Sequence, residues 1–244
     1  MSLSVALSPA GIDADAFDGR AVLVVDVLRA STTVVTALQN GARAVIPVAD
    51  KGEAGRLAAT LDRETTVLGG ERGGETLAGF ALGNSPREYT EAAVGGKTVV
   101  LTTTNGTTAL VRARSAARLA MGALVNAAAS ADFLRRALED GLDAVVLCAG
   151  WEGRVALEDA LCAGLLVDRL ADHPSAPPLD DGARIAHGLY RGARDDLARA
   201  LFGADHTRRL VALGAGDDVA LCARLDASDV LPIYRDNQLV AGAA

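Results

Sequence analysis

Cysteine, histidine and aromatic residues are scarce in this chain of 244 residues, and each scarcity argues against a class of protein. The three cysteines are an odd number without C-x-x-C spacing, which argues against a disulfide framework and a zinc site. The three histidines are scattered late in the chain, so no histidine metal cluster is indicated. Aromatic residues make up only 3% of the chain, so the core must consist of Ala, Val and Leu.

Long apolar runs and excess positive charge are also lacking. No apolar stretch reaches the roughly 18 residues of a membrane-spanning helix, and the opening MSLSVALSPAG has no basic segment of a signal peptide. The net charge of −7 argues against binding to nucleic acids or anionic membranes. We therefore expect a cytoplasmic protein with no nucleic-acid or membrane partner. A small anionic ligand held by a few arginines and assembly into a homo-oligomer are both compatible with this composition.

Short runs rich in β-branched residues alternate with Ala-rich helical stretches. This alternation predicts an α/β fold with three α/β/α layers around a largely parallel or mixed sheet. Gly41 and Gly141 stand where glycine would end two of the helices. The expected strands are Ala21–Val25, Ala44–Val48, Thr66–Leu68, Thr98–Thr103, Ala117–Met121 and Ala144–Cys148. The expected helices are Thr32–Gln39, Glu53–Leu61, Pro86–Ala93, Thr107–Ala116, Ala131–Glu139 and Leu157–Leu170.

The chain changes character at Asp172–Gly182, a proline-rich and polar segment that is typical of a loop. Residues 1–171 form the expected α/β core and carry all the strand-end motifs. Residues 183–244 predict a helical pair over Ala183–Leu201, then a helix and a closing strand or hairpin. The sequence leaves open whether this second part is a separate domain.

Polar residues follow the first expected strand, AVLVVD, at the edge where open α/β sheets bind their ligands. Asp26 ends the strand, and Arg29 follows three residues later. A buried strand end seldom carries a charged pair without a ligand or a mutual partner. We therefore interpret Asp26 and Arg29 as catalytic residues, whereas Ser31 is explained as a helix cap.

Two further motifs, LGGERGG and LGNSPREY, follow the third expected strand. Glu71 lies with an arginine between two Gly-Gly pairs, which allow a ligand to approach the backbone closely. Ser85 and Glu88 have the spacing of a capping box around a proline, so we assign them a structural role. The residues left to bind a substrate are Arg72, Asn84 and Arg87.

Four hydroxyls, an asparagine and a glycine gather in the turn TTTNGT, which follows the strand KTVVL. A helix is expected to begin near Thr107, so free backbone N–H groups and the helix dipole favour an anion here. One threonine suffices as a cap, and we therefore expect the turn to bind a phosphate-sized anion. The predicted binding residues are Thr103, Thr104, Gly106 and Thr107, with Asn105 as a catalytic hydrogen-bond donor.

The strand that ends at Cys148 is followed by a helix that begins with Glu158 and Asp159. The helix dipole alone could explain these acids, but inward-facing carboxylates could also bind a metal ion. Oxygen ligands without a histidine cluster suit Mg²⁺ rather than Zn²⁺. The candidate Mg²⁺ ligands are Asp26, Glu71, Glu158 and Asp159. Together with the anion site they indicate Mg²⁺-assisted phosphoryl transfer or hydrolysis.

Two other classes of function stay open at this point. One is a cysteine hydrolase similar to the isochorismatase-like amidases, with a triad of Asp26, Lys97 and Cys148. Lys97 begins its strand, about 15 Å from the edge where the other residues lie, and Cys148 is also explained as a small core residue. The other is a non-catalytic module that binds an anion without a metal ion.

Five blocks of the sequence together resemble the 2-phosphosulfolactate phosphatase (ComB) family. They run in order from about Val22 to Ala163, and weaker similarity continues through DDVALCARLD and VLPIY. Ala81 departs from the acidic or amide residue expected at its position, which puts in doubt a ligand role there. The blocks are VVDVLRASTTVVTALQNGA, LGGERGG, GFALGNSPREYT, GKTVVLTTTNGTTAL and CAGWEGRVALEDALCAG.

The resemblance implies a Mg²⁺-dependent acid phosphatase of α/β/α architecture. Such an enzyme hydrolyses (2R)-2-phospho-3-sulfolactate to 3-sulfolactate and phosphate, a step of coenzyme M biosynthesis, or acts on a related phosphorylated hydroxy acid. This substrate carries phosphate, carboxylate and sulfonate groups, so several arginines are required. The motif arginines assigned to it are Arg29, Arg72 and Arg87.

Overall fold

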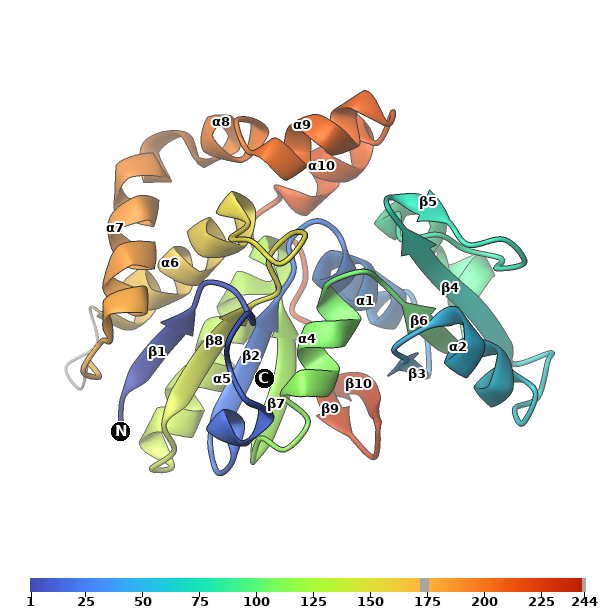
Figure 1. The fold of residues 1–244 in the computed structure, drawn as a ribbon, viewed down its shortest axis with the longest axis horizontal. Helices are drawn as coiled ribbons and strands as arrows, with labels where there is room; N and C mark the ends of the chain where they lie inside the picture. Colours follow the sequence, from blue (N-terminus) through green and yellow to red (C-terminus); the bar gives the residue numbers. More distant parts are fainter. Residues whose placement is uncertain (172–175, 243–244) are drawn as a thin grey trace.

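A computed structural model describes residues 1–171 and 176–242, whose strands form one ten-stranded mixed sheet. The strand order is β1-β8-β2-β7-β9-β10-β3-β6-β4-β5 (Figure 1). The strands are β1 (Leu3–Ala6), β2 (Ala21–Val25), β3 (Ala44–Pro47), β4 (Thr66–Arg72), β5 (Glu75–Thr76), β6 (Thr98–Thr102), β7 (Arg118–Gly122), β8 (Ala144–Cys148), β9 (Leu231–Arg235) and β10 (Gln238–Gly242). The α-helices are α1 (Ala30–Gln39), α2 (Lys51–Ala58), α3 (Glu91–Val94), α4 (Gly106–Arg112), α5 (Ala127–Glu139), α6 (Leu157–Ala171), α7 (Asp181–Ala193), α8 (Leu197–Phe202), α9 (Asp205–Ala212) and α10 (Gly216–Cys222).

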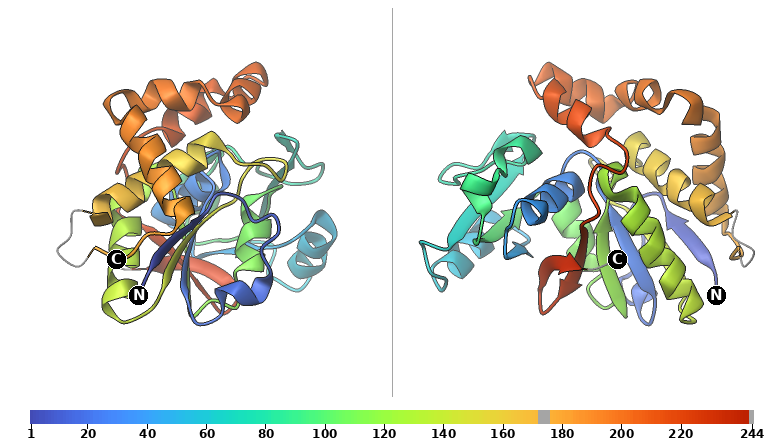
Figure 2. Two further views of the ribbon diagram at one scale, coloured as in Figure 1. Left: turned by 60° about the vertical axis from the view of Figure 1, so that its left-hand side comes forward. Right: turned by 180° about the vertical axis from the view of Figure 1, so that it is seen from behind.

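The first four strands in this order, β1, β8, β2 and β7, are parallel and form one group of the sheet, with β1 at its edge. β2 reads AVLVV and is buried on both faces, as expected for a parallel strand that helices cover on each side. Because side chains alternate along a strand, Leu23 packs toward α5 and α6, whereas Val22 and Val24 pack toward α1 and α4. The views from front and back show α4 on one face of these strands and α5 on the other (Figures 1 and 2).

A second parallel group contains β3, β6 and β4. The β9–β10 hairpin joins it to the first group through antiparallel contacts, β7 with β9 and β10 with β3. The two groups are splayed in Figure 1, and their carboxyl ends converge beneath the C-terminal helices. This convergence places the loops after β2, β4, β6 and β8 around a common space.

The three-layer α/β architecture expected from the sequence is confirmed, with a mixed rather than a wholly parallel sheet. β2 and β8 have the predicted bounds, and both C′ glycines adopt the left-handed conformation, with φ of 83° at Gly41 and 87° at Gly141. The hairpin predicted near the C-terminus is present. Among the strands and α-helices of the described residues, β1, β5 and α9 were not predicted.

The helix expected over Pro86–Ala93 was wrong. A 3-10 turn covers Pro86–Glu88, and only α3 is α-helical in that segment. The capping box assigned to Ser85 and Glu88 is also absent: the Ser85 hydroxyl donates to Asp218 at 2.6 Å, and a Glu88 oxygen accepts from the Gly83 N–H. Ser85 therefore bonds to a distant helix rather than capping its own.

The C-terminal helices α8, α9 and α10 lie above the carboxyl ends of the strands, while the hairpin that follows them returns to the sheet (Figure 1). Residues 172–175 of the expected loop lie outside the described residues. No helix among residues 1–171 and 176–242 combines the length and the apolar character needed to cross a membrane.

Candidate active site

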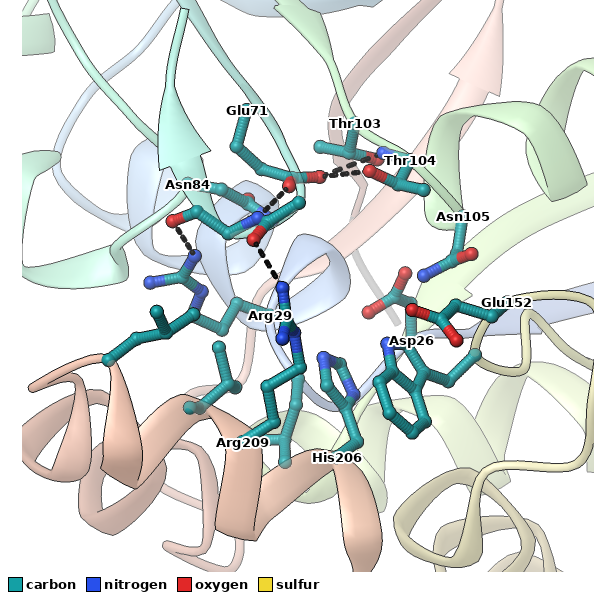
Figure 3. A pocket seen from close by; sticks show the side chains of 16 residues that line it. Asp26, Arg29, Glu71, Asn84, Thr103, Thr104, Asn105, Glu152, His206 and Arg209 are labelled. Carbon is teal, nitrogen blue, oxygen red and sulfur yellow. Dashed lines mark hydrogen bonds between the residues drawn. The ribbon is translucent and has the colours of Figure 1, made fainter.

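A pocket lies where the loops after β2, β4, β6 and β8 meet α9 (Figure 3). Its wall is unusually polar for a chain in which half of the residues are hydrophobic. Carboxylates, guanidinium groups, amides, hydroxyls and one imidazole all reach it. The polar and aromatic residues that line it are Asp26, Arg29, Glu71, Asn84, Thr103, Thr104, Asn105, Trp151, Glu152, His206 and Arg209.

Asp26 directly follows β2, lines this pocket and is only 5% exposed. One of its oxygens, Oδ1, accepts from the backbone N–H of Ala30 at 3.2 Å. Burial is the main cause that raises the pKa of Asp26 from 3.8 to about 6, against a lowering effect of His206. Gly106 makes room for the carboxylate, because a Cβ there would lie 2.7 Å from Oδ2. The TTTNGT glycine thus allows α4 to begin directly beside the acid.

Arg29 enters the pocket from the same loop and forms a buried ion pair with Asp218 of α10, at 2.7 Å. The two side chains are only 7% and 5% exposed. The other oxygen of Asp218 accepts from the Ser85 hydroxyl, so its carboxylate is fully engaged. Arg29 also donates to the carbonyl of Gly74 at 3.3 Å. These contacts fix the guanidinium group and hold α10 against the core.

Glu71 joins the loop after β4 to the TTTNGT turn. Its Oε1 accepts from the backbone N–H and the hydroxyl of Thr104 at 2.8 and 2.9 Å, and its Oε2 accepts from the Gly74 N–H at 2.8 Å. The dashed lines in Figure 3 mark these bonds. The carboxylate faces the pocket, 6% exposed, with both oxygens already hydrogen-bonded.

Two hydroxyl groups of the TTTNGT turn, those of Thr103 and Thr107, form hydrogen bonds within the turn itself. The Thr103 hydroxyl accepts from the backbone N–H of Thr107 at 3.1 Å, and the Thr107 hydroxyl donates to the Thr103 carbonyl at 3.0 Å. Asn105 differs, because its side chain lines the pocket and makes no capping bond. Thr103 and Thr104 also line the pocket, whereas Thr107 does not.

The sequence did not predict the pocket residues that the C-terminal half of the chain contributes. His206 and Arg209 come from α9, an element that was not predicted, and Trp151 and Glu152 come from the loop after β8. Arg209 donates to the Gly73 carbonyl at 3.3 Å. A charged helix is usually a solvated surface, so the sequence held no signal for His206 and Arg209. Trp151 and Glu152 lie in the CAGWEGRVALEDALCAG block, but no role was assigned to them.

Two predicted arginines do not reach the pocket. Arg72 donates to the carbonyls of Glu71 and Ala49 and to the Thr102 hydroxyl, so it supports the β4 loop from another side. Arg87 forms an exposed ion pair with Asp217 at 2.8 Å. Arg29 and Arg209 are the arginines that line the pocket.

The two acids at the start of α6 are buried but occupied by protein partners. Asp159 accepts from the backbone N–H groups of Val27 and Gly150 at 2.8 and 3.0 Å, which ties the ends of β2 and β8 together. Glu158 bonds to His206. Neither residue lines the pocket that contains Asp26 and Glu71. We therefore leave both out of the metal site considered below.

The triad of a cysteine hydrolase is not assembled. Cys148 is fully buried and burial raises the pKa of its thiol well above the usual range, which disfavours a thiolate. Lys97 precedes β6 and donates to the Ala93 carbonyl at 2.9 Å. Neither residue lines the pocket of Asp26.

Under the phosphatase function that the family resemblance implies, Cys148→Ala is expected to keep a substantial part of the turnover. The smaller side chain should lower the free energy of unfolding by about 1–2 kcal/mol, because it leaves a small cavity in the core. Phosphate release and urea unfolding of the same preparation check both parts. Loss of all turnover in a folded Cys148→Ala protein would contradict this assignment.

Fold and pocket together define an α/β protein with a polar pocket, lined by carboxylates and arginines, at the carboxyl ends of its strands. The family model of 2-phosphosulpholactate phosphatase matches residues 6–237. A probable 2-phosphosulfolactate phosphatase of Symbiobacterium thermophilum is 40% identical over 227 residues, which cover 93% of this chain and 96% of the relative. A probable 2-phosphosulfolactate phosphatase of Parasynechococcus marenigrum is 43% identical over 227 residues, 92% of each chain. The chain belongs to the 2-phosphosulpholactate phosphatase family.

Proposed function

We propose that this protein hydrolyses 2-phospho-3-sulfolactate, or a closely related phosphorylated hydroxy acid, to the free hydroxy acid and phosphate. The observation that carries this proposal is the pocket itself, where two arginines and an asparagine amide face a buried aspartate. The names of the relatives supply the substrate. With 3-sulfolactate as the product, the reaction is of the type found in coenzyme M biosynthesis.

The charge of the substrate matches the positive groups that reach the pocket. Phosphate, carboxylate and sulfonate need several cationic or N–H donors, and Arg29 and Arg209 are suited to bind such anions. We assign the phosphate to the TTTNGT side, where the amide of Asn105 would contact it. The other residues proposed to surround the substrate are Asn84, Thr103 and Thr104. Gly106 and Thr107, which the sequence also suggested, do not line the pocket, and the Thr107 N–H donates to the Thr103 hydroxyl.

The pocket also fits a divalent cation. Mg²⁺ is usually held by one or two carboxylates together with water and substrate phosphate, so a complete protein cage is not needed. The described residues contain no group of three or more histidine, cysteine or acidic side chains that could hold an ion alone. Asp26 and Glu71 both line the pocket, and the buried Oδ1 of Asn84 has no hydrogen-bond partner within the described chain. We propose Asp26 as the Mg²⁺ ligand, with Glu71 as its neighbour.

Mg²⁺ bound there would neutralise charge on the transferred phosphoryl group. The chain's own residues would do the rest: Arg29 and Arg209 orient the anionic substrate, and Asn105 donates to the phosphate oxygens. The α9 helix contributes His206, Arg209 and Leu210 to the wall of the pocket.

Phosphate release tests the proposal directly. The wild-type protein should release phosphate from 2-phospho-3-sulfolactate, lose this activity in EDTA and regain it with added Mg²⁺. Phospholactate, which lacks the sulfonate, should react with a higher KM because one anionic group is missing. Activity that is indifferent to EDTA would overturn the metal assignment. Binding of the substrate without any release would indicate an anion-binding module instead.

Asn105→Ala is expected to lower kcat/KM by roughly tens to hundreds of fold, because a hydrogen-bond donor to the transition state is lost. The fold should survive, since the Asn105 side chain makes no capping bond. Thr108→Ala is a matched control on the same turn: its side chain is exposed, and its hydroxyl bonds only to the Thr104 carbonyl. Equal kinetics in the two variants would show that the turn is structural.

A further inference from the structure

His206 is held by a buried acid on another helix. Its Nδ1 lies 2.8 Å from Oε1 of Glu158, the second residue of α6. Glu158 is only 1% exposed, and its other oxygen, Oε2, has no hydrogen-bond partner among the described residues. A buried carboxylate is costly unless a cation or a donor satisfies it. The one polar partner that the described structure gives Glu158 is His206, so this hydrogen bond holds the carboxylate and the ring together.

The ring of His206 is also fixed by stacking. It lies parallel to the indole of Trp151, with ring centroids 5.2 Å apart and planes 7° from parallel. One ring nitrogen is bonded to Glu158 and one face is covered by Trp151. The remaining nitrogen, Nε2, belongs to a ring that lines the pocket beside Asp26 and Arg29 (Figure 3). A ring held on two sides presents Nε2 in a fixed orientation.

The geometry points to His206 as the general acid of the reaction, and we propose that its Nε2–H protonates the ester oxygen of the substrate. Glu158 is its positioning residue. This inference rests on the proposed phosphatase function and extends it to two residues outside the strand-end motifs. The leaving group of a phosphorylated hydroxy acid is an alkoxide, which is a poor leaving group unless it is protonated.

The proposed step balances in protons and electrons. A water oxygen forms the new bond to phosphorus, and the bond between phosphorus and the ester oxygen breaks with its electron pair on that oxygen. The ester oxygen takes the proton of Nε2 and leaves as the hydroxyl of the product. The attacking water contributes its two protons to the product dihydrogen phosphate. One of these then returns to Nε2, directly or through solvent, and restores the imidazolium ion.

His206→Gln is the first test, and the chain supplies a matched control in His187→Gln. His187 also bonds to an acid of α6, with its Nε2 2.8 Å from Oδ1 of Asp168, but it lies on α7 and does not line the pocket. Loss of a general acid should lower kcat by about 10²–10⁴-fold, with KM changed by less than a few fold. His187→Gln should leave both parameters near those of the wild type.

The pH profile separates an acid from a purely structural residue. Several charged groups share a pocket with His206: Glu158 of α6, Asp26 and Arg29 of the β2 loop, Glu71 of β4, Glu152 and Arg154 of the β8 loop, and Asp205 and Arg209 of α9. A general acid predicts a wild-type kcat that falls on the alkaline side of the pH profile, and His206→Gln should lack this fall. An unchanged alkaline fall in His206→Gln would overturn the proposal.

Glu158 is tested by two replacements of different chemistry. Glu158→Gln keeps an oxygen that can accept from Nδ1–H, whereas Glu158→Ala removes it. A positioning role predicts a larger loss of kcat in Glu158→Ala than in Glu158→Gln, at similar KM. Equal losses would contradict orientation through this hydrogen bond. If the wild type releases no phosphate at all, the proposed function fails. If it is active and His206→Gln is equally active, only this inference fails.

Discussion

Asp26→Asn is expected to abolish phosphate release while making the metal-free protein more stable. Turnover should fall by at least about a hundred-fold, because the carboxylate supplies the charge of the proposed Mg²⁺ site. The Mg²⁺ concentration needed for half of any residual activity should rise. Asn keeps an oxygen that can accept from the Ala30 N–H, so the local backbone should not change.

The gain in stability follows from the raised pKa of Asp26, about 6 in the folded protein against 3.8 for the free group. The folded chain then binds this proton more tightly than the unfolded chain, so wild-type stability falls as pH rises from about 4 to 6. Two pKa units correspond to about 3 kcal/mol at most. A neutral amide avoids this cost, and Asp26→Asn should therefore gain on the order of 2–3 kcal/mol at pH 7–8.

Urea unfolding in EDTA at pH 8 and near pH 4 measures this effect. The advantage of Asp26→Asn should be full at the higher pH and nearly absent at the lower one. Asp50→Asn is a control in which the free energy of unfolding at pH 8 should fall rather than rise. The Glu53 N–H lowers the pKa of that exposed carboxyl, so its charged form is favoured in the folded protein. A destabilised Asp26→Asn protein at pH 8 would show that the wild-type carboxylate has favourable partners in the metal-free state.

The sequence was informative where a residue's role follows from its own strand or turn. Asp26, Glu71 and Asn105 were predicted from the strands they follow, and all three line one pocket. Parallel strands deliver their carboxyl ends to one edge, so the positions could be compared before the fold was known. The same reasoning placed Arg72 and Arg87 with them, but neither lines the pocket. The direction of a long side chain cannot be predicted from its position in the sequence alone.

Residues that depend on contacts between distant segments could not be predicted. Asp218 is 189 residues from Arg29 along the chain, and Glu158 is 48 residues from His206. Each of these acids lies in the first turn of a helix, where the helix dipole gives a sufficient local explanation. Only the docking of α9 and α10 over the strand ends turns them into partners of pocket residues.

Asp218→Ala is expected to destabilise the protein by about 3–5 kcal/mol, because it leaves the Arg29 guanidinium buried without its partner. The Ser85 hydroxyl would lose its acceptor as well. Phosphatase activity should fall with stability, since Arg29 lines the pocket and would no longer be fixed. The free energy of unfolding and kcat/KM at a temperature where the variant is folded measure the two effects.

The neighbouring residue provides a control within the same helical turn. Asp217 pairs with Arg87 at 2.8 Å, but the two side chains are 75% and 56% exposed. Asp217→Ala should change stability by less than about 1 kcal/mol, because exposed ion pairs contribute little. Both acids lie in the first turn of α10, so each variant loses a similar interaction with the helix dipole. This loss cancels when the stabilities of the two variants are compared.

A double variant distinguishes an unpaired charge from a general weakening of α10. Replacing both buried partners by apolar residues, as Arg29→Met with Asp218→Leu, removes the two charges together, and much of the lost stability should return. Activity should stay low, because Arg29, one of the two arginines that line the pocket, is gone. If Asp218→Ala is as mild as Asp217→Ala, α10 does not bury the Arg29 pair in solution. The pocket would then be more open than the fold described here.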